Sequence, residues 1–208
     1  MNQVALLVIA KDPVPGRAKT RLTPPCSPAQ AAWLAEAALR DTLDVVARTP
    51  AARKVLVLEG APKRWRRAGL EVLPQRGAGL GERLAAAFAD VDGPALLVGM
   101  DTPQLSPELL LDGLRALARP RVDAVLGQTL DGGYWSVGLK HDALRVFTGV
   151  PMSSVDTWMV QRRRLRELGL RVHEQQVLRD VDTIDDARAV ARQAPGTRFA
   201  GALAAIAA

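Results

Sequence analysis

Four cationic side chains follow the first apolar run of the chain within eleven residues. The run Val4–Ala10 is typical of a buried strand, and the Pro/Gly segment after it carries Lys11, Arg17, Lys19 and Arg21. Ligands of open α/β sheets bind beyond the carboxyl ends of the strands, and arginine and lysine can neutralise a diphosphate there. The pattern therefore indicates a phosphate site, with a solvated charged loop as the alternative.

An isolated carboxylate, Asp101, follows the apolar run Ala95–Gly99. At the mouth of a parallel sheet a carboxylate is costly unless it meets a cation or a metal ion. Magnesium and manganese prefer such oxygen ligands and bridge to substrate phosphates. Asp101 is thus a candidate metal ligand, and the alternative is a turn cap before Thr102-Pro103.

Two further acids, Asp180 and Asp182, are two residues apart near the end of the chain. In an extended segment they point to the same side, so both are candidates to complete a metal site begun by Asp101. The following pair, Asp185 and Asp186, is better explained by the favourable electrostatics of a helix start.

Two glycine-containing segments could contact a substrate. Gln75–Leu84 is a glycine-rich entry to a helix, whose N–H groups could hold a base or a ribose. Asp131–Trp135 places an acid and two aromatic residues at a flexible turn, which suits an acceptor site. For each, the alternative is a tight turn with ordinary packing.

Apolar runs alternate with amphipathic segments, which predicts an α/β fold with a mainly parallel sheet. The predicted strands are Val4–Ala10, Lys54–Glu59, Leu70–Pro74, Ala95–Gly99, Asp123–Gly127, Tyr134–Leu139 and Arg171–Val177. The predicted helices are Pro28–Arg48, Gly81–Ala89, Pro107–Ala118, Val155–Leu168, Ile184–Gln193 and the tail Gly201–Ala208. In the first helix, Trp33 and Leu39 are among the residues at the spacing of a buried face.

Composition narrows the classes of function. The 208 residues suit one domain, 1–208, and 28 basic against 22 acidic residues give a net charge of +6, which suits a phosphate-bearing partner. The basic clusters Lys63–Arg67 and Arg162–Arg166 show no aromatic-basic interleaving of the RNA-binding kind, so we interpret them as solvated helix faces and expect no nucleic-acid partner. The single Cys26 excludes an internal disulfide. No apolar run could span a membrane and residues 1–12 lack an export signal, so we expect a cytoplasmic protein.

Five ordered motifs, taken together, resemble a known family. They are Lys11–Leu22, Gly79–Leu84, Gly99–Pro103, Asp131–Trp135 and Asp180–Thr183. In this order they resemble bacterial glycosyltransferases of the type found in arsenosugar biosynthesis. They are also similar to phospholactate guanylyltransferase and to molybdenum-cofactor nucleotidyltransferases. The resemblance implies a three-layer α/β/α nucleotide-diphospho-sugar transferase (GT-A-like) fold.

The resemblance also implies roles for individual residues. The nucleotide-binding set would be Lys11, Gly16, Arg17, Lys19, Arg21, Gly79 and Gly81. A magnesium or manganese ion would be held by Asp101, Asp182 and Asp180, and the catalytic side chains would be Asp101, Lys19 and Asp131.

Two transferase activities fit this pattern, besides a non-enzymatic binding module. The first is metal-dependent glycosyl transfer from a nucleotide-diphosphate sugar to a small-molecule acceptor. The second is nucleotidyl transfer from a nucleoside triphosphate to a phosphorylated small molecule. Glycosyltransferases of this fold often carry Asp-x-Asp, whereas this chain has Gly99 at the first position, which keeps the second activity open. Met152-Ser153-Ser154 also departs from the family's usual aromatic-serine pattern, so the acceptor pocket can differ. The base, the sugar, the acceptor and the oligomeric state are left open.

Overall fold

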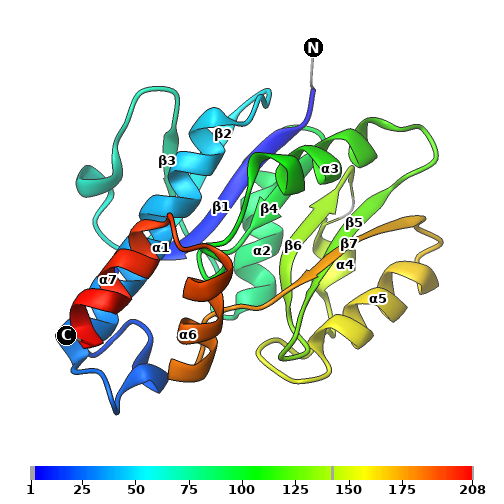
Figure 1. The fold of residues 1–208 in the computed structure, drawn as a ribbon. Helices are drawn as coiled ribbons and strands as arrows, with labels where there is room; N and C mark the ends of the chain where they lie inside the picture. The colour runs from blue at the N-terminus through cyan, green and yellow to red at the C-terminus, as the bar shows by residue number, and fades with distance from the viewer. Residues whose placement is uncertain (1–2, 142, 208) are drawn as a thin grey trace.

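The seven strands of the protein form one sheet (Figure 1). The computed structural model describes residues 3–141 and 143–207, so Ala208 of the predicted tail and the first two residues lie outside the described part. Along the sheet the strand order is β3-β2-β1-β4-β6-β5-β7. The strands are β1 (Ala5–Lys11), β2 (Lys54–Glu59), β3 (Glu71–Pro74), β4 (Ala95–Val98), β5 (Ala124–Thr129), β6 (Tyr134–Leu139) and β7 (Val172–Leu178).

The sheet is parallel apart from β6, which runs antiparallel to β4 and β5 on either side. In register, Val8 of β1 lies beside Val98 of β4, and Thr129 of β5 lies beside Leu178 of β7. The parallel strands therefore end at one edge of the sheet, where β6 begins. The prediction of a mainly parallel α/β sheet is confirmed.

Helices cover both faces of the sheet (Figure 1). They are α1 (Pro28–Arg48), α2 (Leu80–Ala89), α3 (Pro107–Ala118), α4 (Ala143–Phe147), α5 (Thr157–Glu167), α6 (Ile184–Gln193) and α7 (Arg198–Ala207), with 3₁₀ turns η1 (Thr20–Leu22) and η2 (Pro62–Trp65). Side chains alternate along a strand, so Leu6 of β1 packs with α1 and α3 while Leu7 packs with α2, α4 and α5. These two cores make the three layers that the sequence predicts.

A third apolar cluster joins α6 and α7 to the outer side of α1. Leu34 and Ala38 of α1 pack there with Val190 and Phe199. Asp41 of α1 accepts hydrogen bonds from the backbone N–H groups of Arg198 and Phe199, at 3.0 and 2.9 Å, and so satisfies the start of α7. This contact across the fold explains why the tail helix begins before the predicted Gly201.

Several local expectations need correction. Trp33 is 45% exposed and does not belong to the buried face of α1. The fifth helix begins at Thr157 instead of Val155, because Thr157 closes a turn in which its hydroxyl donates to the carbonyl oxygens of Pro151 and Ser154. Helix α4 and the two 3₁₀ turns are not in the predicted set. Within the described residues, no helix has the length and apolar character required to cross a membrane.

Candidate active site

A cleft of about 620 Å³ lies at the edge where the parallel strands end. We call it the first cleft. Five cations line it: Lys11, Arg17, Lys19, Arg21 and Arg83. The acids Asp101, after β4, and Asp182, after β7, line it as well. The structure thus brings together cations and acids that are distant in the sequence, such as Arg21 and Asp182, which lie 161 residues apart.

Residues 11–21, from the end of β1 into η1, carry four of these cations, and we call this segment the cation loop. It is anchored by Asp12. The Asp12 carboxylate accepts hydrogen bonds from the buried Trp65 indole, at 2.9 Å, and from the Ala61 N–H, at 3.3 Å. Gly60 has a φ of +143°, and a Cβ placed there would lie 2.2 Å from the Asp12 Cβ. Glycine is required at this position for the cation loop to approach η2.

Lys19 lies at the centre of the charged site. Its side chain is only 10% exposed, and its Nζ is 2.8 Å from Asp101 Oδ1 and 3.4 Å from Asp182 Oδ1. Nζ also donates to the carbonyl oxygen of Val181. Burial lowers the pKa of Lys19, but Asp101 and Asp182 outweigh this effect and raise the pKa above its usual value. Lys19 is therefore a fixed positive charge.

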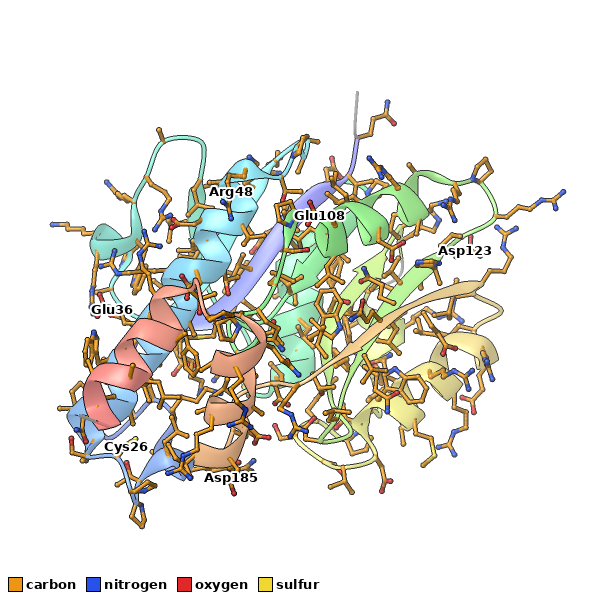
Figure 2. The ribbon with its side chains drawn as sticks, viewed as in Figure 1. Cys26, Glu36, Arg48, Glu108, Asp123 and Asp185 are labelled. Carbon is orange, nitrogen blue, oxygen red and sulfur yellow. The ribbon has the colours of Figure 1, made fainter. Side chains whose placement is uncertain are left out.

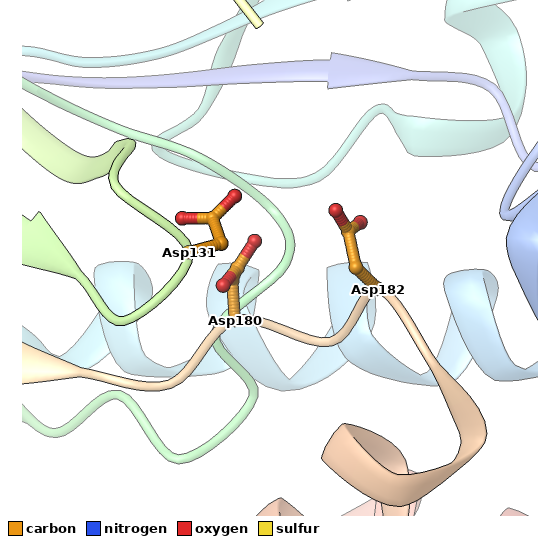
Figure 3. A group of neighbouring side chains, drawn as sticks. All are labelled: Asp131, Asp180 and Asp182. Atoms are coloured by element: carbon orange, nitrogen blue, oxygen red, sulfur yellow. The ribbon is translucent and has the colours of Figure 1, made fainter. Parts of the chain in front are cut away.

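Three carboxylates form a group (Figure 3), and one of them, Asp182, is the 3.4 Å partner of Lys19. Oxygen atoms of Asp131, Asp180 and Asp182 lie within 4.8 Å of one another. Burial raises the pKa of Asp180 to about 6, and the neighbouring charges of Asp131 and Asp182 contribute to this shift. Hard oxygen ligands at this spacing fit magnesium or manganese. Asp131, which the sequence suggests as an acceptor-site acid, is thus also placed to hold a metal.

Hydrogen bonds hold two of the acids, Asp131 and Asp101, in place. Asp131 Oδ1 accepts hydrogen bonds from the Thr129 hydroxyl, at 2.6 Å, and from the Gly133 N–H, at 2.9 Å, which leaves Oδ2 for a ligand. Asp101 accepts a backbone hydrogen bond from the Val181 N–H at 2.9 Å, which ties the end of β4 to the segment after β7. Asp101 is paired with Lys19 and is not part of the three-carboxylate group.

The predicted glycines do not line the first cleft, although residues next to them do. Gly16, Gly79 and Gly81 are not among its lining residues, whereas their neighbours Arg17 and Leu80 are. A Cβ on Gly81 would lie 3.4 Å from the Met152 side chain, so this glycine permits close packing of α2.

Two polar lining residues of the glycine-rich segment are missing from the predicted site set. Gln75 donates to the Ala10 carbonyl oxygen at 2.8 Å, and Arg83 is 2.5 Å from Glu59. Arg83 belongs to the motif Gly79–Leu84, four residues after Gly79, in the first turns of a predicted helix. This position was the signal that could have identified Arg83 as a site residue.

A second cleft of about 490 Å³ adjoins the first. The two share Arg21, Asp101, Tyr134, Ser153 and Asp182 among their lining residues, and Asp131 and Asp180 line the second alone. Burial raises the pKa of the Tyr134 hydroxyl above its usual range, so this side chain stays neutral. Cations thus line the first cleft and acids mainly line the second, and the carboxylates of Asp101 and Asp182 line both.

Comparison with protein families identifies the chain. Residues 34–154 match the family described as "Uncharacterized protein conserved in bacteria (DUF2064)". The chain belongs to the DUF2064 family. The matched part of this DUF2064 protein includes Asp101 and Asp131, while the cation loop and Asp182 lie outside it. The comparison with curated proteins found no match.

Solved structures extend the comparison to the whole DUF2064 chain. A provisionally assigned nucleotide-diphospho-sugar transferase from Desulfovibrio desulfuricans G20 is similar, with a TM-score of 0.86 and 27% identity, covering 98% of this chain and 94% of that one. A CMP:2-keto-3-deoxy-manno-octonic acid synthetase complexed with CTP has a TM-score of 0.62 and 12% identity, covering 92% and 99%. Rv0371c from Mycobacterium tuberculosis H37Rv, in complex with manganese, has a TM-score of 0.57 and 22% identity, covering 91% and 97%. The last two show the fold alone, and that fold is the one used by nucleotide-diphospho-sugar transferases and cytidylyltransferases.

Proposed function

We propose that this protein is a metal-dependent glycosyltransferase that takes a sugar from a nucleotide-diphosphate donor and passes it to a small-molecule acceptor. The observation that carries the proposal is the meeting of the cation loop with the acids after β4 and β7 in one cleft. The 27% identical structure assigned to nucleotide-diphospho-sugar transfer supports the choice of donor. The motifs favour the arsenosugar-biosynthesis type within the family.

The cation loop would bind the donor diphosphate. Arg17 is exposed and forms no ion pair with any described residue, so its guanidinium is available for phosphate oxygens. Arg21 is 71% exposed and pairs with Asp182 at 2.8 Å, which orients it at the same opening. Lys19 adds a positive charge that the neighbouring Asp101 and Asp182 stabilise. Such preorganised cations stabilise the charge that develops on a departing diphosphate.

The acids would hold the metal ion and receive the acceptor. The proposed ligands are Asp180 and Asp182, which belong to the three-carboxylate group, and Asp101, which pairs with Lys19 in this structure. When bound, magnesium or manganese supplies further neutralisation of the diphosphate. The free carboxylate oxygen of Asp131 is placed to take the proton of an acceptor hydroxyl. The acceptor oxygen then bonds to the sugar carbon as the nucleoside diphosphate leaves. We propose residues 1–208 as one transferase domain, since Arg21 and Asp182 build the same cleft.

Product analysis tests the proposal. Nucleotide sugars with each common base are incubated with the protein and manganese, and nucleoside triphosphates are tested in parallel. We expect release of nucleoside diphosphate from one nucleotide sugar, and loss of that release with a chelator. Release of pyrophosphate from a triphosphate, with nucleotide sugars inert, would instead establish nucleotidyl transfer.

A further inference from the structure

The second cleft differs sharply in charge from the first. Four acids line it: Asp101, Asp131, Asp180 and Asp182. Arg21 is the one cation among its lining residues in the described part of the chain, and it pairs with Asp182 at 2.8 Å. A divalent ion held by the carboxylates still leaves these side chains with a negative balance. By contrast, five cations line the first cleft.

Neutral hydrogen-bonding groups accompany the acids. Thr102 is 1% exposed, and its hydroxyl oxygen forms no hydrogen bond with any described residue. Ser153 is exposed and has a φ of +59°, a conformation that is costly for a residue with a side chain. The surrounding turn is held by Thr157, whose hydroxyl donates to the carbonyl oxygens of Pro151 and Ser154. The Ser153 backbone is therefore fixed at the border of the two clefts.

Apolar side chains also line the second cleft. Trp135, Met152 and Val155 line it beside Tyr134, whose hydroxyl lies 3.5 Å from the Met152 sulfur. The Val155 side chain is 77% exposed at the rim. These side chains can pack against the carbon face of a small molecule while the hydroxyls and carboxylates bind its polar groups.

We propose that the acceptor is a hydroxyl-bearing molecule that carries no phosphate or other anionic group, and that it binds in the second cleft. The inference rests on the proposed glycosyl transfer and adds the chemical class of the acceptor. Carboxylates accept hydrogen bonds from hydroxyl groups but repel a phosphate ester, which carries a charge of about −1.5 to −2 at neutral pH. Arg21, which lines both clefts, is already paired with Asp182, and the other cations of the site line the first cleft, where the donor diphosphate would occupy them.

Matched pairs of compounds test the proposal. The protein is saturated with magnesium, which is diamagnetic, and a nucleoside diphosphate, and binding of glycerol against glycerol 3-phosphate and of glucose against glucose 6-phosphate is followed by saturation-transfer NMR. We expect the neutral member of each pair to bind more tightly than its phosphate ester by about tenfold or more, because like charges at close range are strongly unfavourable. Equal responses within both pairs, including no response from any compound, would overturn the proposal.

A pair of charge variants assigns the discrimination to the second cleft. Val155→Lys adds a cation at its rim, whereas Leu144→Lys adds one on α4, where Leu144 is 72% exposed and lines neither the first nor the second cleft. Val155→Lys should narrow the difference between glucose and glucose 6-phosphate severalfold, and Leu144→Lys should leave it unchanged. Equal effects of the two variants would contradict this placement.

Failure of the acceptor proposal can be told apart from failure of the proposed function. Nucleoside diphosphate release that a phosphate ester stimulates more than its neutral partner would overturn the acceptor class and keep glycosyl transfer. Pyrophosphate release with a phosphate ester as acceptor would overturn both.

Discussion

Arg17 and Lys19 are two residues apart in the cation loop, yet their surroundings separate their roles. Arg17 is exposed and forms no ion pair with the described residues, whereas Lys19 is buried against Asp101 and Asp182. Under the proposed function, removing Arg17 would take away a ligand contact, whereas removing Lys19 would also take away the ion-pair partner of Asp101. Sequence spacing identifies both as cations after a strand but cannot show which of them the fold buries.

We predict that Arg17→Ala weakens nucleoside diphosphate binding by ~1.5–3 kcal/mol, the usual value of a hydrogen bond to a charged group. Its melting temperature should match that of the wild type because the side chain stabilises nothing in the free protein. Calorimetric titration measures the affinity. Arg121→Ala, an exposed cation between α3 and β5, is the control and should bind normally. Unchanged affinity in Arg17→Ala would remove this residue from the site.

At the scale of elements, the segment between β7 and α6 decides where Asp180 and Asp182 lie. Thr183 begins α6 with a capping box, in which its hydroxyl accepts from the Asp186 N–H and the Asp186 carboxylate accepts from the Thr183 N–H. Arg179 lies 2.7 Å from the same carboxylate. The helix start therefore fixes the chain directly after the metal-ligand candidates.

We predict that Thr183→Ala lowers the free energy of unfolding by ~1 kcal/mol, the typical value of a lost helix cap. It should also weaken manganese binding, because Asp182 adjoins the cap. Chemical denaturation and manganese titration measure the two effects. Ser27→Ala removes the matching capping box of α1, away from the acids, and should show the stability loss alone. A Thr183→Ala variant with normal manganese affinity would contradict the positioning role.

Most elements could be predicted because their signals are local. Ser106 before Pro107 predicts the start of α3, and the apolar alternation predicts β6 to the residue. The start of α7 could not be predicted, since Asp41 supplies its cap from another part of the chain. The grouping of Asp131 with Asp180 was also beyond reach, because it depends on the position of antiparallel β6 within the sheet.

At the scale of the molecule, the charges divide between the cleft and the outer faces. In the Arg162–Arg166 cluster, Arg166 lies 3.7 Å from Glu174 and Arg163 lies 3.6 Å from Glu167. In the Lys63–Arg67 cluster, Arg67 lies 2.9 Å from Asp44. These ion pairs reduce the positive potential outside the cleft, so the net charge of +6 does not form one basic surface.

We predict that the protein does not bind nucleic acid tightly at physiological salt. The basic clusters are partly neutralised and carry no row of aromatic residues on which bases could stack. Fluorescence anisotropy with a labelled duplex and a labelled single strand measures this. Sub-micromolar binding that disappears in an Arg163→Ala and Arg166→Ala double variant would show that the α5 face is a nucleic-acid site.

The end of the molecule away from the cleft provides a pH prediction. In Figure 2, Asp123 lies far from Asp185, which marks α6, the helix that follows the cleft acids Asp180 and Asp182. Arg171 hydrogen-bonds to the Asp123 carboxylate and lowers its pKa to about 2. A lowered folded-state pKa stabilises the protein above the unfolded value of 3.8, and this contribution is lost as the pH falls toward 2. Asp123→Asn should therefore melt below the wild type at pH 7, and the difference should shrink below pH 4. A difference independent of pH would contradict this.

The central claim is that the strand-end carboxylates hold a divalent ion together with the nucleotide diphosphate. Calorimetric titration of a nucleoside diphosphate, with and without manganese, tests it in the wild type, in Asp101→Asn and Asp182→Asn, and in the control Asp185→Asn. Asp185 is 86% exposed on α6 and lines neither cleft, so its variant removes a nearby negative charge without changing a cleft residue. We predict that manganese strengthens nucleotide binding in the wild type and in Asp185→Asn. The gain should fall by about tenfold or more in both cleft variants, because even partners of metal ligands cost this much when mutated. Manganese-dependent binding at wild-type strength in Asp101→Asn and Asp182→Asn would contradict the account.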